Sequence, residues 1–227
     1  MQIQNIGQVG TFSTEQNKVL RNTYMMLALT MIPTVIGAYI GTTMDFSFMA
    51  ASPIMSSLLM FGAMIGMMFA VTALRNSIWG VVALFGFTFV AGVILGPILQ
   101  AALSFRNGAQ LVGMAAGGTG IIFFSLAMIA TVTKKDFSFM GKFLFIGLIL
   151  LIVASLANLF FQIPALSLTI SAISVLIFSA YILFDVSRIV NGGETNYVMA
   201  TLGIFLSIYN LFISLLHLLM AFAGERD

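Results

Sequence analysis

Seven apolar runs, each long enough to cross a lipid bilayer as a helix, occupy most of this sequence. A helix of about 20 residues rising ~1.5 Å per residue spans a hydrocarbon core roughly 30 Å thick. We therefore predict an all-α, polytopic membrane protein, a seven-transmembrane helix bundle of residues 22–227 that follows a cytoplasmic N-terminal tail of residues 1–21. The predicted spans are 22–42, 53–74, 78–103, 110–133, 141–161, 165–190 and 197–223.

Composition agrees with the membrane assignment and excludes several kinds of site. Charged residues make up 7% of the chain and hydrophobic residues 60%, whereas soluble domains carry about 25% charged residues. The net charge of +2 offers no basic face for nucleic acid, and the absence of cysteine excludes disulfides and thiolate-bound metals. We expect the lipid bilayer as a partner, no nucleic acid, no cofactor and no metal. The polar start of the chain lacks the basic segment of a signal peptide.

The distribution of basic residues predicts the orientation of the spans. One side collects Lys18, Arg21, Arg75, Lys134, Lys135, Lys142 and Arg188, whereas the other has Arg106 and Arg226. Because cytoplasmic loops are enriched in Lys and Arg, we predict a cytoplasmic N-terminus and a C-terminus on the opposite side of the membrane. The sequence S-T-E-Q at 13–16 has the spacing of a capping box and predicts the start of a short helix.

Asp185 is an acidic residue near the end of the sixth apolar run. A carboxylate within a span costs roughly 2.5–3.5 kcal/mol on insertion scales, so it is expected to face partners or water. It shares a helical face with a stripe of mostly polar residues: Ser167, Ser171, Ser174, Phe178, Tyr181 and Arg188. The last run has its own stripe of Gly203, Ser207, Asn210, Ser214 and His217. A short turn joins the two runs, so we predict a polar seam between them.

Each candidate side chain of this seam has two interpretations. Asp185 either pairs with Arg188 or water, or takes part in an ion site with Tyr181 and Asn210. Arg75 is either an interfacial anchor or a latch on Asp185. Asn210 is either an interhelical hydrogen-bonding residue or an ion ligand, and His217 is expected to be a packing residue with its hydrogen bonds satisfied.

Small residues predict how the helices pack. The glycine pairs 37/41, 62/66, 92/96 and 113/117 have the G-x-x-x-G spacing that lets membrane helices approach closely. Some such pairs arise by chance among 21 glycines, and we expect the pairs to serve packing within the bundle and not dimerisation. Gly96-Pro97 lies inside the third run and predicts a kink, because proline removes a backbone hydrogen bond.

An enzyme is not expected from the inventory of side chains. The single histidine cannot form a two-histidine zinc helix, and no G-x-S-x-G nucleophile motif is present. A Ser214–His217 pair would share one helix without a visible oxyanion hole.

Several segments together resemble the Bax inhibitor-1 (TMBIM) family, and within it the bacterial YccA-type modulators of the FtsH protease. These segments are NKVLRNTY at 17–24, LGPIL at 95–99, KKDFSFMG at 134–141, ILFDVSRIV at 182–190, GGETNY at 192–197 and LSIYNLFISLL at 206–216. The resemblance implies seven helices with the last one central, in a bacterial inner membrane with the C-terminus in the periplasm. It also implies a regulator that binds and inhibits FtsH, a membrane-anchored AAA protease, and that is itself degraded by it.

The same resemblance implies an alternative function, a pH-sensitive calcium or proton leak. Leak-forming members of the family pair two aspartates on their last two helices, with a basic residue of the second span as the latch. Asp185 matches the first aspartate, and Arg75 falls within about one position of the latch by alignment of the resembling segments. Leu211, next to Asn210, stands at the second aspartate, so the paired carboxylates are missing. A purely structural assembly factor is the third interpretation.

Overall fold

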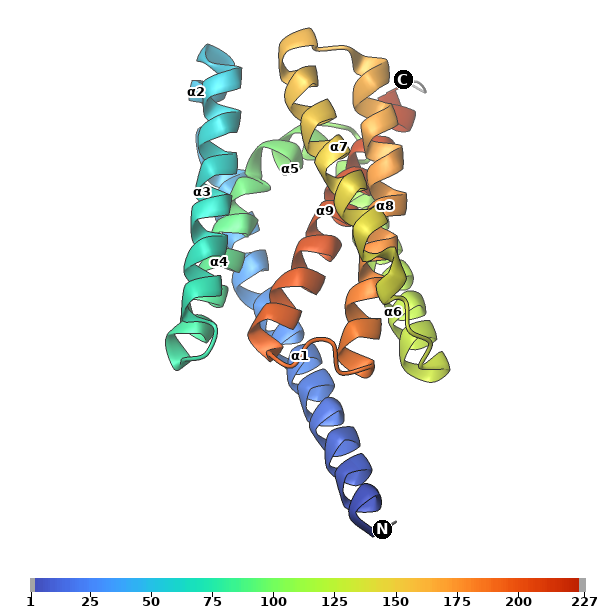
Figure 1. Ribbon diagram of the computed structural model, residues 1–227. Helices are drawn as coiled ribbons and strands as arrows, with labels where there is room; N and C mark the ends of the chain where they lie inside the picture. Colours follow the sequence, from blue (N-terminus) through green and yellow to red (C-terminus); the bar gives the residue numbers. More distant parts are fainter. Residues whose placement is uncertain (1–2, 225–227) are drawn as a thin grey trace.

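The computed structural model describes the backbone of residues 3–224 and the side chains of residues 16–224 except residue 50. Within these residues the chain is helical, without strands, and seven spans are long and apolar enough to cross a membrane. The fold class predicted from the sequence is therefore confirmed (Figure 1). The elements are α1 (Ile3–Thr43), α2 (Ser47–Ala51), α3 (Pro53–Leu74), α4 (Ile78–Ile94), α5 (Gly96–Leu103), α6 (Gly108–Thr133), η1 (Ser138–Met140), α7 (Gly141–Phe161), α8 (Pro164–Val190) and α9 (Tyr197–Gly224).

The first helix begins much earlier than the sequence predicted. α1 is continuous from Ile3, so the motif at 13–16 lies inside the helix and does not start one. Extending an existing helix avoids the cost of nucleation, which explains why the polar leader continues the helix of the first span. Figure 1 shows the N-terminal part of α1 projecting beyond the turns of the bundle. The domain boundary after residue 21 stays a prediction.

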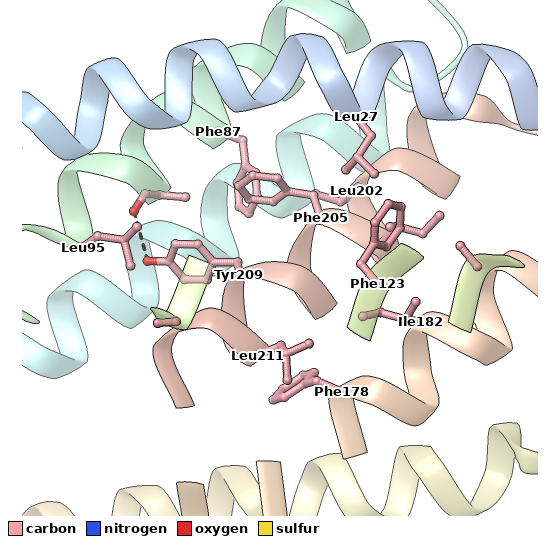
Figure 2. Packing of buried hydrophobic residues seen from close by; sticks show 14 of the residues in the cluster. Leu27, Phe87, Leu95, Phe123, Phe178, Ile182, Leu202, Phe205, Tyr209 and Leu211 are labelled. Atoms are coloured by element: carbon pink, nitrogen blue, oxygen red, sulfur yellow. Dashed lines mark hydrogen bonds between the residues drawn. The ribbon is translucent and has the colours of Figure 1, made fainter. Parts of the chain in front are cut away.

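The last helix lies at the centre of the bundle. α9 contacts α1, α3, α4, α5, α6 and α8, and among the described spans only α7 lacks a contact with it. Within its most apolar stretch, 44% of residues are buried, against 11% for α3 and α7. Figure 2 shows how Phe205 and Tyr209 of α9 pack with Phe87 of α4 in the core.

The third span is broken where the sequence predicted a kink. α4 ends at Ile94 and α5 starts at Gly96, next to Pro97. The Tyr209 hydroxyl donates a 3.0 Å hydrogen bond to the carbonyl of Ala91, one turn before the break (Figure 2). Gln100 of α5 places its Nε2 3.2, 3.2 and 2.8 Å from the carbonyl oxygens of Gly41, Thr42 and Met44. One side chain thus satisfies carbonyls that the end of α1 leaves without helical partners.

Two of the four glycine pairs pack as predicted. A Cβ on Gly37 would collide with the Phe89 carbonyl oxygen, and one on Gly92 with the Thr34 carbonyl oxygen. Gly41 and Gly96 meet at the same crossing, since a Cβ on Gly41 would lie 3.0 Å from the Gly96 Cα. These four glycines bring α1 and the α4–α5 span into close contact.

The prediction for the other two glycine pairs is wrong. A Cβ added at any of these four residues would meet no atom within 4 Å: Gly62, Gly66, Gly113 and Gly117. Residues 62 and 66 face outward from α3, and 113 and 117 face outward from α6. The spacing alone does not reveal which side of a helix contacts a neighbour.

Candidate functional site

Asp185 faces inward, toward the central helix. It lies in the second-last turn of α8, and its Oδ2 is 3.3 Å from where a Cβ on Gly203 of α9 would be. The absence of a side chain at Gly203 makes room for the carboxylate. The prediction that Asp185 turns away from lipid toward the last helix is therefore confirmed.

The carboxylate of Asp185 borders a cavity of about 290 Å³, which we call the acidic cavity. Among the described residues, Asp185 forms no hydrogen bond and no ion pair within 4.0 Å. The cavity lies between α3, α8, α9 and the α8–α9 turn, and its lining residues are Met68, Thr72, Asp185, Arg188, Glu194, Met199, Ala200, Leu202, Gly203 and Leu206.

Arg188 pairs with Glu194 and not with Asp185. Its Nη2 lies 3.7 Å from Glu194 Oε2 and donates a 3.2 Å hydrogen bond to the carbonyl of Gly193. The guanidinium carbon also lies 5.5 Å from the centroid of the Phe184 ring. Arg188, a predicted partner of Asp185, thus lines the same cavity but pairs with the α8–α9 turn.

Arg75 does not latch Asp185. It is exposed at the end of α3, does not line the acidic cavity, and forms no ion pair within the described part of the chain. Its backbone has a structural role, because the Arg75 carbonyl accepts a 3.1 Å hydrogen bond from Asn196 Nδ2. Here the structure agrees with the anchor interpretation of Arg75 and disagrees with the latch.

Asn196 joins the α8–α9 turn to the α3–α4 turn, a role that sequence reasoning missed. Its Oδ1 accepts hydrogen bonds of 3.0 Å from the backbone N–H groups of Val198 and Met199, which caps α9. Its Nδ2 donates a 2.9 Å hydrogen bond to Asn76 Oδ1 in the neighbouring turn. An asparagine directly before an apolar run is a typical N-cap signal and could have been used to find it.

The α6–α7 loop is fixed to the end of α8 by two further residues that the sequence analysis did not single out. Ser187 Oγ accepts a 3.0 Å hydrogen bond from the N–H of Phe137 and donates a 2.9 Å bond to the carbonyl of Lys135. Asn191 Nδ2 lies 3.3 Å from the same carbonyl oxygen. Within this loop, Asp136 is exposed and accepts hydrogen bonds from the side chain and the backbone N–H of Ser138. These hydrogen bonds lower the pKa of Asp136. At this end of the bundle, the α6–α7 loop is therefore bonded to the end of α8, and the α3–α4 turn is bonded to the α8–α9 turn.

Asn210 and Tyr181 take no part in the acidic cavity. Asn210 Nδ2 donates a 2.8 Å hydrogen bond to Leu206 in its own helix, so the predicted interhelical hydrogen bond is absent among the described residues. Asn210 lines a second cavity, away from Asp185. Tyr181 packs edge-on against Phe184 and beside Phe178, with ring centroids 6.3 Å apart in both pairs.

The opposite end of the polar seam contains one hydrogen bond between α8 and α9. Ser171 Oγ and His217 Nδ1 are 2.8 Å apart, and the direction of this bond depends on the histidine tautomer. His217 therefore has its partner, as predicted. Asn158 of α7 accepts a 3.0 Å hydrogen bond from the N–H of Ile163.

The position expected for a second aspartate is occupied by a core residue. Leu211 is fully buried and packs close to Phe178 (Figure 2). The acidic cavity instead has Glu194 as its second carboxylate, and that group is paired with Arg188. The described residues contain no group of three or more His, Cys, Asp or Glu side chains that could hold a metal ion.

Comparison with known proteins places this architecture in a family. The family described as "Inhibitor of apoptosis-promoting Bax1" matches residues 16–224. The chain is 42% identical over 203 residues to the "Modulator of FtsH protease YccA" of Escherichia coli K12, covering 89% of this chain and 90% of the relative. It is 43% identical over 205 residues to an uncharacterized membrane protein of Vibrio cholerae, covering 90% of each chain. With its seven apolar helices and inward aspartate, the chain is a multi-pass membrane protein that belongs to the Bax inhibitor-1 family.

Proposed function

We propose that this protein is an inner-membrane modulator of an FtsH-type protease, which it binds and inhibits. The observation that carries the proposal is the 42% identity, over nine-tenths of both chains, to a relative named as a modulator of FtsH. A second relative, at the same identity, is named as the inner membrane protein YccA. The proposal includes no chemistry at the acidic cavity, and the relatives' names describe modulators and membrane proteins, not enzymes.

The projecting start of α1 is the proposed point of engagement. Gln16 still touches the bundle, since its Nε2 lies 2.7 Å from where a Cβ on Gly192 would be. Residues 3–15 precede this contact and extend α1 by about 20 Å at ~1.5 Å per residue (Figure 1). Terminal segments with few tertiary contacts open at low free-energy cost. We propose that the protease grips this segment on the cytoplasmic side, and that the bundle behind it resists extraction.

This proposal is tested by co-expression with FtsH and one of its membrane substrates. We expect the full chain to copurify with FtsH from mild detergent, to be degraded slowly, and to lengthen the half-life of the other substrate. Removal of residues 1–16 should abolish both its own degradation and the protection. Replacing residues 1–16 with a Gly/Ser segment of equal length tests whether the protease requires the sequence of the leader or only its length.

Two results would contradict the proposal at different points. If the shortened chain is still degraded and still protects the second substrate, the leader is not the point of engagement. If the full chain neither copurifies with FtsH nor alters substrate turnover, modulation of the protease itself is wrong.

A pH-sensitive calcium or proton leak is the second candidate, favoured by the position of Asp185 at the acidic cavity. In this function Asp185 would bind the ion near the cytoplasmic end of α8, with Glu194 as the nearby acidic group and Arg188 as its counter-charge. Asn210 lies in a different cavity, so a path through both residues needs a rearrangement. Calcium or proton flux into vesicles containing the protein, abolished by Asp185→Asn, would support the leak, and flux equal to that of empty vesicles would exclude it.

A further inference from the structure

A second cavity, of about 360 Å³, lies between four helices away from Asp185, and we call it the lateral cavity. The residues that line it come from α3, α7, α8 and α9. Its lining residues are Ser57, Phe61, Leu148, Leu151, Ile152, Ser155, Leu156, Leu159, Ser174, Phe178 and Asn210.

Two polar side chains of the lateral cavity keep hydrogen-bonding groups free for a ligand. Ser174 is only 7% exposed, and its hydroxyl makes no hydrogen bond to the described residues. Asn210 uses one N–H on Leu206, which leaves its second N–H and its Oδ1 free within the described part of the chain. Because both side chains line the cavity, a ligand within it can hydrogen-bond to both of them.

The rim of the cavity faces the lipid. Phe61 of α3 is 42% exposed and Ser155 of α7 is also exposed, whereas Ser174 and Phe178 are buried. These rim residues lie inside apolar spans, not in the connecting turns. A ligand would therefore enter sideways from the bilayer between α3 and α7.

Shape and charge narrow the class of ligand. Leu148 and Leu159 on α7 are about 16 Å apart along the helix at ~1.5 Å per residue, so the cavity is long and runs parallel to the helices. Its described lining residues include no charged side chain, which disfavours a phosphate or carboxylate group. Ser174 lies about 15 Å inside α8 and Asn210 near the middle of α9, so the polar groups are near the bilayer midplane.

We infer that the lateral cavity binds an uncharged lipid that carries a carbonyl or hydroxyl oxygen on an apolar body. The oxygen accepts hydrogen bonds from Ser174 Oγ and Asn210 Nδ2, and the apolar part lies between Phe61 and the leucines of α7. Two kinds of membrane molecule have this chemistry, an alkyl-substituted quinone and a diacylglycerol. The site is independent of the acidic cavity and of any interaction with FtsH.

Equilibrium binding to the purified full chain in detergent tests this inference. The radiolabelled probes are a decyl-substituted benzoquinone, dioctanoylglycerol, and decylbenzene as the oxygen-free control. We expect saturable binding, near one molecule per chain, of at least one oxygen-bearing probe, and none of decylbenzene. Binding of the benzoquinone probe identifies a quinone as the natural ligand, and binding of dioctanoylglycerol identifies a glycerolipid.

Three variants relate binding to the cavity. Ser174→Ala removes one hydrogen-bonding group and should weaken binding about three- to tenfold, while Ser155→Phe should block the rim and abolish it. Thr169→Ala, an exposed position on the same helix outside the cavity, should bind as the native chain does. The inference is overturned if neither oxygen-bearing probe saturates, if decylbenzene binds equally well, or if Ser174→Ala and Ser155→Phe both leave binding unchanged.

Discussion

At the scale of single residues, the same glycine spacing has opposite consequences in different helices. Gly92 lies against the backbone of α1, where a Cβ would collide with the carbonyl oxygen of Thr34. Gly62 on α3 has no neighbouring atom within 4 Å of a Cβ. This contrast provides a matched pair of substitutions.

We expect Gly92→Ala to destabilise the bundle by about 1–3 kcal/mol, because the two backbones must separate to admit a methyl group. Gly62→Ala should be neutral or stabilise by up to about 1 kcal/mol, because alanine favours helix more than glycine does. Thermal unfolding of both variants in detergent, followed by circular dichroism, measures the difference. Equal loss of stability in the two variants would contradict the packing described for α1 and α4.

The direction of Asp185 was predictable from the sequence, but its partners were not. Spacing along one helix places Asp185 on the face that meets α9, where Gly203 leaves room. Whether Arg188 turns toward Asp185 or toward Glu194 depends on the conformation of the α8–α9 turn, including Gly192 at a φ of +76°. Spacing within a helix does not determine the conformation of a turn. The latch interpretation of Arg75 was not supported by the structure because the Arg75 side chain is exposed and does not line the cavity.

At the scale of elements, single amide side chains hold helix ends in place. Gln100 contacts three carbonyl oxygens at the end of α1, and Asn196 both caps α9 and contacts the α3–α4 turn. The kink at Pro97 was predictable from residue chemistry. The contact of Gln100 with α1 was not, because it joins positions far apart in the sequence.

Replacing Gln100 with leucine should leave the final carbonyls of α1 without this partner. We expect a loss of about 1–3 kcal/mol and faster amide hydrogen exchange in α2 and the residues between α1 and α2. Gln110→Leu is the control, since Gln110 is exposed on α6 and its side chain makes no hydrogen bond to the described residues. Unchanged exchange in Gln100→Leu would show that the cap does not stabilise the end of α1.

Asn196→Ala removes the cap of α9 together with the link to Asn76. The expected cost is roughly 0.5–2 kcal/mol, and serine at this position should restore the cap but not the link. Stability of the native chain and of the alanine and serine variants separates the two contributions. Native stability in the alanine variant would contradict the role of Asn196.

At the scale of the whole molecule, the number of spans and the inward aspartate followed from residue patterns, and the central place of α9 from the family resemblance. The lateral cavity could not be predicted from the sequence, because it depends on how four helices lie relative to one another. The helical leader was also missed, since a polar composition does not reveal that a helix continues from the following span.

The orientation of the bundle is a prediction that the absence of native cysteine makes simple to test. A single cysteine at Lys135, on the basic end, should react with a membrane-impermeant maleimide only after the cells are permeabilised. A single cysteine at Asn107, between α5 and α6 on the opposite end, should react from outside. The reverse pattern would place the N-terminus outside and exclude engagement of the leader by a cytoplasmic protease.

The most direct measurement of the central claim is the half-life of an FtsH membrane substrate in cells that contain the full chain, the chain without residues 1–16, or neither. Our account predicts a longer half-life with the full chain, and the same short half-life in the other two cases. A half-life that is the same with and without the full chain would contradict the claim that this protein modulates the protease.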